Sequence, residues 1–434
     1  MSAHVSQELR AHGVAQVIVI LKAAPPRAVE MALGRPAGTV GAATVGALVA
    51  GLARCFATAA TSQVGAITSA AAEGRPWRPA VRAGRAGPAA CASVPAVRFY
   101  PNLGVLLGAV DRAGLAALRA DPRVSAVVGA PALSPIRPQR RAAARPRRGT
   151  TWGIQALRAP ALWKQGLSGK GVLVGHLDTG VDGRHPTLRA AIAAFAEFDD
   201  LGREVRPAPR PFDSQDHGTH TAATIAGRPA GDRHVGVAPG ARLASALVIE
   251  GGDVVARVLG GMDWAVGQGV RILSLSLGFR GWWEDFLPLT RLLRERNVLP
   301  VFAVGNEGPG TSRSPGNYPE ALSVGAAGRA GEVADFSSSQ RFRRRREPLV
   351  PDLVAPGIDV VSARPGGGYQ AMDGTSMATP HVAGLAALLM EARPDRSAGE
   401  VEAALFQSCR LAPGMTRTRA NRGTADAVLA LASL

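Results

Sequence analysis

The residues DGTSMATPH at positions 373–381 set a serine between a glycine-containing turn and a run rich in Ala and Leu. This run predicts a helix over Met377–Glu391, so Ser376 would stand where the turn meets the helix. The start of a helix has unpaired N–H groups and a partial positive charge, which can stabilise an oxyanion. Ser376 is therefore a candidate nucleophile, although serine is also a common N-cap with a purely structural role.

Strands and helices alternate on the N-terminal side of this segment, from Trp152 onward. Apolar runs rich in β-branched residues predict strands, and apolar residues at helical spacing predict helices. The strands are predicted at 172–178, 243–249, 272–277 and 298–304, and further helices at 217–226 and 254–266. Such alternation is typical of an α/β fold with a mostly parallel sheet and helices on both faces.

Polar residues stand at the ends of three predicted strands. Asp178 ends the first strand, residues 276–278 (SLG) end another, and Asn306 follows the strand at 298–304. In parallel sheets the reactive groups collect at the carboxyl ends of the strands. We therefore expect these residues to lie together.

A serine nucleophile needs a general base and an orienting carboxylate. The residues DHGTH open a predicted helix and hold His217 and His220, either of which could take the proton. The two could also form half of a zinc site, but no residues at zinc-ligand spacing complete it. The carboxylate could come from Asp178 or Asp182. Asn306 could donate its side-chain N–H to an oxyanion or serve as a turn residue.

In the order Asp, His, Asn, Ser, these segments resemble those of the subtilisin-like serine peptidases, the subtilase family. The resemblance covers roughly Trp152 to Met390. It rests on DTGVDGRHP at 178–186, DHGTHTAATIAG at 216–227, GVAPGARL at 236–243, LSLSLG at 273–278, AVGNEG at 303–308, VAPG at 354–357 and GTSMATPHVAG at 374–384.

The resemblance implies roles that the residues alone leave open. It selects Asp178, His217 and Ser376 as the catalytic triad, in preference to Asp182 and His220. It implies an oxyanion hole made of the Asn306 side chain and the Ser376 N–H group. The substrate-binding residues that it implies are Ser276, Leu277, Gly278, Gly305 and Thr375.

The implied activity is that of a serine endopeptidase, with protein or peptide substrates and an acyl-enzyme intermediate. The resemblance implies no cofactor or metal ion in the chemistry. Structural calcium is common in the family, but Thr187 stands where an Asp ligand often occurs, and residues 228–234 lack the usual Asn and Asp run. These departures make a structural calcium ion doubtful here.

Residues 1–130 predict a small α+β domain before the peptidase domain at 151–434. The predicted strands are 14–22, 96–107 and 124–128, and the predicted helices are 26–33 and 111–119, the latter with Asp111 as its N-cap. Residues 36–90 are rich in Ala, Gly and Arg and predict a flexible insertion. Residues 131–150 hold Pro and an Arg cluster and predict a linker.

The segments at 14–22 and 102–128 resemble, more weakly, the inhibitory propeptide of the family. This resemblance implies a proenzyme whose N-terminal region chaperones folding and occupies the cleft as an intramolecular inhibitor. We expect autoprocessing within residues 131–150.

The net charge of +17 suggests a polyanionic partner, but residues 1–150 hold 19 Lys and Arg against 5 Asp and Glu. Because the rest of the chain is nearly neutral, we expect no specific nucleic-acid partner. No apolar run predicts a convincing membrane span. Residues 1–13 lack the basic segment of a secretory signal, which leaves the compartment open.

Two other functions fit parts of the pattern. A catalytically inactive binding module of the same fold would be expected to lack a triad residue, and none is missing. A peptide ligase or macrocyclase would use the same acyl-enzyme and would differ in whether an amine or water receives the acyl group. The sequence leaves this alternative open.

Overall fold

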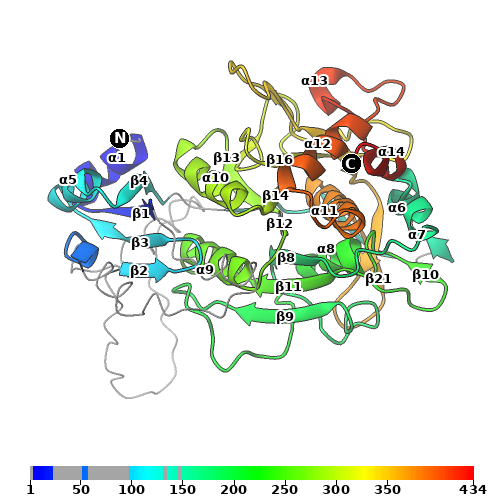
Figure 1. Ribbon diagram of the computed structural model, residues 1–434, viewed down its shortest axis with the longest axis horizontal. Coiled ribbons are helices and arrows are strands. Elements are labelled where there is room, and N and C mark those ends of the chain that lie inside the picture. The colour runs from blue at the N-terminus through cyan, green and yellow to red at the C-terminus, as the bar shows by residue number, and fades with distance from the viewer. Residues whose placement is uncertain (1–2, 23–50, 57–96, 131–133, 145–147, 250) are drawn as a thin grey trace.

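The computed structural model describes residues 3–22, 51–56, 97–130, 134–144, 148–249 and 251–434 (Figure 1). A small N-terminal domain lies beside a larger domain that is built on one parallel sheet. In the described parts of the chain, no helix is both long enough and apolar enough to cross a membrane.

Seven parallel strands form the central sheet, in the order β19-β16-β14-β12-β8-β11-β9. They are β8 (Leu173–Asp178), β9 (Ile192–Glu197), β11 (Arg242–Leu247), β12 (Ile272–Leu275), β14 (Leu299–Ala303), β16 (Leu322–Ala327) and β19 (Leu353–Pro356). Most of their side chains are buried, because helices cover both faces and alternate residues therefore meet apolar surroundings on either side. The predicted α/β fold is confirmed.

Helices on the two faces of the sheet create two separate apolar cores. One core holds α8 (His217–Ala226), α11 (Thr375–Ala392), α12 (Ala398–Ser408) and α14 (Ala427–Ala432). The other holds α9 (Val254–Gly267) and α10 (Leu287–Glu295). The helices predicted at 217–226 and 254–266 are therefore present, and the predicted helix at 377–391 begins two residues earlier, at Thr375.

The remaining elements of the larger domain are short. They are α6 (Trp152–Ala156), α7 (Ala159–Trp163), α13 (Arg417–Ala420), the 3-10 helix η1 (Glu284–Phe286), β5 (Ser134–Pro135), β6 (Arg140–Ala144), β7 (Gly149–Thr150), β10 (Arg233–His234), β13 (Leu277–Arg280), β15 (Arg313–Ser314), β17 (Gln340–Arg341), β18 (Leu349–Val350), β20 (Val360–Ala363) and β21 (Tyr369–Asp373). The strand predicted at 272–277 thus ends at Leu275, because Leu277 pairs with β5 outside the central sheet. The segment predicted as a linker forms β5, β6 and β7 in its described part.

The small domain has an antiparallel sheet with strand order β2-β3-β1-β4. Its elements are α1 (Ala3–His12), β1 (Ala15–Leu21), β2 (Val97–Tyr100), β3 (Val105–Val110), α5 (Arg112–Ala120) and β4 (Val124–Gly129). Asp111 caps α5 as predicted, since its carboxylate accepts the Gly114 N–H at 2.7 Å. The single strand predicted at 96–107 is wrong: a turn divides it, where Pro101 lacks a donor and Gly104 adopts a φ of +70°.

Part of the predicted flexible insertion at 36–90 is ordered. Residues 51–53 are helical, and the side chains of Leu52 and Phe56 are buried in the core of the small domain. The expectation of a wholly flexible insertion is therefore wrong for these residues, because burial of two large apolar side chains can offset the entropy of ordering a short segment. The rest of the insertion and the predicted helix at 26–33 lie outside the described residues.

The small domain packs on α9 and the segment leading into α10, as Figure 1 shows. The Tyr100 hydroxyl donates to the Ala256 carbonyl at 3.2 Å, and the Leu103 N–H donates to the Asp263 carboxylate at 2.8 Å. The Gly129 N–H donates to the Asp285 carboxylate at 3.0 Å. Strand ends and turns of the small domain thus find acceptors on the larger one.

The first turn of α8 lies against the loop that follows β8. A Cβ atom added to Gly218 would lie 2.0 Å from the carbonyl oxygen of Gly180, so no larger residue fits between these segments. Thr179 reinforces the contact, because its hydroxyl accepts the Gly218 N–H at 2.9 Å. This approach fixes where His217 stands relative to β8.

Replacement of Gly218 by alanine should lower the free energy of unfolding by more than about 2 kcal/mol, because the added methyl group overlaps backbone that cannot rotate away. Urea unfolding of the Ser376→Ala chain, which avoids self-digestion, measures the change. Gly399→Ala is the matched control, since its Cβ would approach nothing closer than 4.0 Å. An equal loss for both variants would contradict the prediction.

Candidate active site

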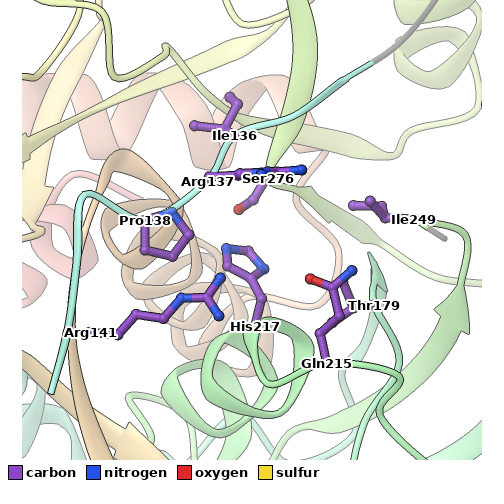
Figure 2. Close-up of a pocket in the computed structure, with 9 residues that line it drawn as sticks. All are labelled: Ile136, Arg137, Pro138, Arg141, Thr179, Gln215, His217, Ile249 and Ser276. Carbon is purple, nitrogen blue, oxygen red and sulfur yellow. The ribbon is translucent and has the colours of Figure 1, made fainter. Parts of the chain in front are cut away.

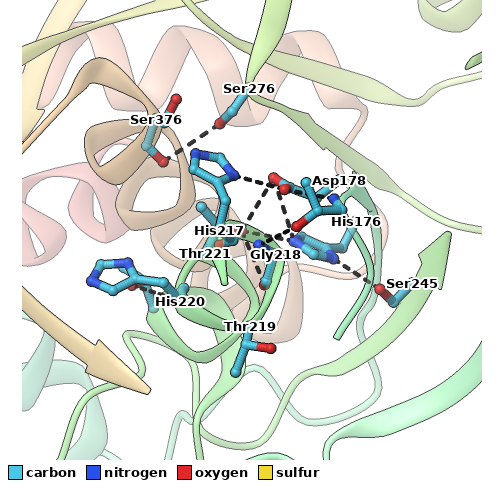
Figure 3. Close-up of polar contacts among 12 residues, drawn as sticks. His176, Asp178, His217, Gly218, Thr219, His220, Thr221, Ser245, Ser276 and Ser376 are labelled. Carbon is cyan, nitrogen blue, oxygen red and sulfur yellow. Dashed lines mark hydrogen bonds and ion pairs between the residues drawn. The ribbon is translucent and has the colours of Figure 1, made fainter. Parts of the chain in front are cut away.

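Three strand ends and two helix starts meet at one edge of the central sheet. β8 ends at Asp178, Ser276 follows β12, and Asn306 lies in the loop after β14. The first turns of α8 and α11 carry His217 and Ser376. Figure 3 shows Ser276 and His217 next to Ser376, with Asp178 on the other side of the His217 ring.

Asp178 and His217 form a buried hydrogen-bonded pair. His217 Nδ1 lies 2.7 Å from Asp178 Oδ1, and the two residues are 6% and 2% exposed. Burial raises the pKa of Asp178, but the charge and hydrogen bond of His217 outweigh this and hold it below the usual value. Burial likewise opposes protonation of His217, yet Asp178 outweighs it and the pKa of His217 is raised. The pair therefore favours an ionised carboxylate beside a basic imidazole.

The rival residues from the sequence make other contacts. His220 Nε2 bonds the Val360 carbonyl at 2.9 Å, and burial lowers the pKa of His220 to about 3. Asp182 accepts the backbone N–H groups of Arg184 and Gly366, both at 2.9 Å. The hydrogen bonds of His220 and Asp182 therefore hold neighbouring backbone segments in place.

Ser376 is the second residue of α11, and Gly374 occupies the N-cap position. The alternative that Ser376 is the N-cap is therefore wrong. Its hydroxyl donates to the carbonyl oxygen of Ile136 at 2.9 Å. The Nε2 atom of His217 is buried and, among the described residues, has no hydrogen-bond partner. In this structure the Ser376 hydroxyl is thus bonded to the chain's own segment at 134–139 and not to His217.

The amide of Asn306 is held in one orientation. Its Oδ1 atom accepts both the N–H and the hydroxyl of Thr375, at 2.9 and 2.8 Å. This leaves Nδ2 to point into the cleft, where it donates to the carbonyl of Arg137 at 2.9 Å. An amide fixed in this way is a preorganised donor to a carbonyl oxygen.

Residues 134–139 lie across this cleft in an extended conformation. β5 pairs antiparallel with β13, with Ser134 opposite Gly278, and the Ile136 N–H donates to the Ser276 carbonyl at 3.2 Å. The Ile136 side chain is 1% exposed. The small pocket in Figure 2 is lined by Ile136, Arg137, Pro138, Arg141, Thr179, Gln215, His217, Ile249 and Ser276.

The next residues continue along a second strand. β6 pairs antiparallel with β21, with Arg140 opposite Asp373 and Ala144 opposite Tyr369. Arg141 forms an ion pair of 2.6 Å with Asp216, the residue before His217. The chain therefore contacts both sides of the candidate nucleophile, through β13 on one side and β21 on the other.

An ion pair between the buried Arg313 and the partly buried Glu307 lies beside Gly305 and Gly278. The Arg313 guanidinium donates to the Glu307 carboxylate at 2.9 Å and to the Gly278 carbonyl at 3.2 Å. Gly305 adopts a φ of +118°, a conformation that favours glycine, and a Cβ atom there would also lie 2.7 Å from Glu307 and 3.1 Å from Arg313. The charges near the implied substrate-binding residues are thus already matched to each other.

The described residues contain no group of three or more His, Cys, Asp and Glu side chains placed to hold a metal ion. The Thr187 hydroxyl, at the position where the resemblance implies a calcium ligand, bonds His185 Nδ1 at 2.8 Å. We therefore derive no step through a metal.

One functional residue escaped the sequence analysis. The Asp213 carboxylate accepts the Thr179 hydroxyl at 2.7 Å and both the N–H and the hydroxyl of Thr219 at 2.6 Å. Burial raises its pKa. Asp213 joins the loop after β8 to the first turn of α8. The one feature of the sequence that could have indicated this role is its position four residues before His217.

Comparison with known proteins gives consistent matches. The profile of the subtilase family matches residues 169–427. Subtilisin Savinase of Lederbergia lenta is 38% identical over 248 residues, which cover 57% of this chain and 86% of that protein. The intracellular serine protease of Paenibacillus polymyxa is 40% identical over 252 residues, which cover 55% of this chain and 72% of that protein.

M-protease of Shouchella clausii is 38% identical over 248 residues, and this chain spans 61% of its length. The family match extends over more than half of the chain. The chain therefore belongs to the subtilase family, whose profile covers its residues 169–427.

Proposed function

We propose that the chain is a serine endopeptidase that hydrolyses peptide bonds through an acyl-enzyme on Ser376. The observation that carries the proposal is the buried Asp178–His217 pair beside Ser376. With Nδ1 bonded to a carboxylate, the imidazole presents Nε2 as the base. Among the described residues this nitrogen has no other partner, so it is available for the serine proton.

In the proposed reaction, Ser376 Oγ attacks the carbonyl carbon of the substrate while His217 Nε2 takes the hydroxyl proton. The C–N bond then breaks, the proton passes to the leaving nitrogen, and an acyl ester remains on Ser376. Water repeats the attack with His217 again as the base and releases the acid. Asp178 stays ionised and stabilises the imidazolium in both halves.

The oxyanion would be held by the Nδ2–H group of Asn306 and the backbone N–H of Ser376. Thr375 supports this role because it fixes the Asn306 amide before any substrate arrives. Donors that need no reorientation stabilise the charge that develops in the transition state more than that of the ground state. The start of α11 adds its partial positive charge at the same point.

A fluorophosphonate probe should label the processed protein at Ser376, because such probes react with a serine that a neighbouring base activates. Intact mass spectrometry measures the labelling, with Ser376→Ala as the unlabelled control. Absence of labelling after the N-terminal region is removed by limited proteolysis would contradict the proposed function. Product masses from a peptide with an added amine acceptor separate hydrolysis from the ligase alternative.

Replacement of Asn306 by alanine should lower kcat by about 10²–10³-fold and leave KM nearly unchanged, because this donor acts mainly in the transition state. Initial rates on a peptide substrate measure both constants. A rise in KM at constant kcat would instead assign Asn306 to ground-state binding.

We further propose that the chain is made as an autoinhibited proenzyme, with its own N-terminal region as the intramolecular inhibitor. Three contacts support this: the Ile136 carbonyl accepts the Ser376 proton, the Arg137 carbonyl accepts from Asn306, and β5 occupies the edge of β13. A substrate would need the same three partners. The hydrogen bonds of the small domain to α9 add to the stability of this state.

The first cut is proposed at the bond between Ile136 and Arg137. The Ile136 N–H is bonded to Ser276, and its carbonyl is the one that contacts the Ser376 hydroxyl. Asn306 contacts the next carbonyl oxygen, that of Arg137. The segment must therefore shift until the Ile136 carbonyl oxygen reaches Asn306 before Ser376 attacks.

Active enzyme should begin at Arg137, as N-terminal sequencing can check, and Ser376→Ala should remain uncut. Ile136→Asp should slow the cut more than about 100-fold, because it would bury an unpaired carboxylate. Arg137→Gln is the matched control, since the Arg137 side chain is exposed, and it should be cut at the same bond. Active enzyme that begins at Met1, or outside residues 131–150, would contradict the proposal.

A further inference from the structure

Behind the Asp178–His217 pair lies a chain of buried polar side chains that the proposed reaction does not use (Figure 3). His176 stands two residues before Asp178 on β8, so both side chains point to the same face of the sheet. His176 Nδ1 lies 2.9 Å from Ser245 Oγ, and His176 Nε2 lies 2.8 Å from Thr221 Oγ1. Thr221 in turn reaches Asp178 Oδ2 at 3.3 Å.

The two carboxylate oxygens of Asp178 differ in the hydrogen-bond donors that they accept from. Oδ1 accepts the Thr179 N–H at 2.8 Å and bonds His217 Nδ1 at 2.7 Å. Within the described part of the chain, the one donor in hydrogen-bond reach of Oδ2 is the Thr221 hydroxyl. The orientation of the carboxylate about its own axis therefore depends on where the single proton of that hydroxyl goes.

The Thr221 proton has competing acceptors. Besides Asp178 Oδ2, they are His176 Nε2 and the carbonyl oxygens of His217 and Gly218, at 3.2 and 3.1 Å. A charged acceptor forms the stronger bond, so Asp178 is preferred over the two carbonyls. If His176 Nε2 lacked a proton, it would take the Thr221 proton at the shorter distance and leave Oδ2 without a donor. The tautomer of His176 decides between these arrangements.

Ser245 sets that tautomer. In the described residues its hydroxyl is bonded to His176 Nδ1 alone, so a buried O–H group would go unpaired unless Nδ1 accepts it. Burial lowers the pKa of His176 to about 4, so the ring is neutral near pH 7 and carries its one proton on Nε2. That proton goes to the Thr221 oxygen and frees the Thr221 proton for Asp178.

We propose that Thr221 is a positioning residue for the catalytic carboxylate, and that His176 and Ser245 act through it as a relay that directs its hydroxyl proton to Asp178 Oδ2. The proposal rests on the proposed function of the Asp178–His217 pair. The relay keeps the carboxylate from rotating and shares its negative charge, which limits how strongly it holds the imidazolium form of His217.

Thr221→Val removes the hydroxyl at constant shape and should lower kcat about three- to tenfold with little change in KM. Without this donor Asp178 attracts the imidazolium more strongly, so the acid limb of kcat/KM should move to higher pH. Besides Asp178, the groups that act on His217 are Asp213, which favours its protonation, Arg141, which opposes it, and the neutral His176 and His220. The variant changes the charge of none of them. Thr221→Ser keeps the hydroxyl and should behave like the wild type.

The role of His176 is tested in the same assay. His176→Leu should lower kcat less than Thr221→Val does, and the double variant should lose no more than Thr221→Val alone, because His176 acts through Thr221. His185→Gln is the control for loss of a buried, doubly bonded histidine, since His185 bonds Thr187 and the Gly368 carbonyl. It should leave the acid limb in place. The proposal would be overturned if the kcat losses of the two single variants multiplied in the double variant. It would also be overturned if Thr221→Val had the same kcat and acid limb as Thr221→Ser.

A second measurement does not depend on activity. In the uncut Ser376→Ala chain, the nitrogen-15 spectrum of the eight histidines should show His176 protonated on Nε2, with its signal identified by loss in His176→Leu. A proton on Nδ1 would overturn the relay. If instead the proposed function were wrong, the fluorophosphonate probe would leave the wild type unlabelled, and His176 would still carry its proton on Nε2.

Discussion

The structure depends on one close contact between backbone segments that are far apart in the chain. The loop after β8 and the first turn of α8 touch at Gly180 and Gly218, and this contact allows Asp178 and His217 to share a short, buried hydrogen bond. Asp213 joins the same two segments through its hydrogen bonds to Thr179 and Thr219. Because the Asp178 carboxylate is buried, its charge is tolerable where these donors are already in place.

Much of the fold could be predicted from the sequence, because parallel strands covered on both faces are continuous apolar runs. The placement of Asp178 and Asn306 at one sheet edge follows from that pattern. The segment at 134–144 could not be predicted as strands, since Pro and Arg indicate a linker and the pairing partners β13 and β21 lie more than a hundred residues away. The relay behind Asp178 was also beyond reach, because His176 and Ser245 meet on neighbouring strands whose register the sequence does not specify.

The uneven charge of the chain has a structural counterpart. Residues 1–150 hold 19 Lys and Arg against 5 Asp and Glu, and the surface that receives the small domain presents carboxylates. Asp253 bonds Arg98 and Gln16, while Asp263 and Asp285 accept backbone N–H groups. Part of the positive charge of the N-terminal region, that of Arg98, is thus paired with a carboxylate of the larger domain. Such pairs weaken with salt where solvent reaches them.

Strand β6 lies on the far side of the proposed cut from the small domain, and this position would separate cleavage from activation. When the bond before Arg137 breaks, β6 stays covalently joined to the peptidase domain and keeps its pairing with β21 and its Arg141–Asp216 contact. As a tethered strand it faces the site at an effective concentration of about millimolar or more. If the proposed cut is made, the new N-terminus would compete with an incoming chain, and the affinity of β6 for β21, rather than the cut, would set when the enzyme opens.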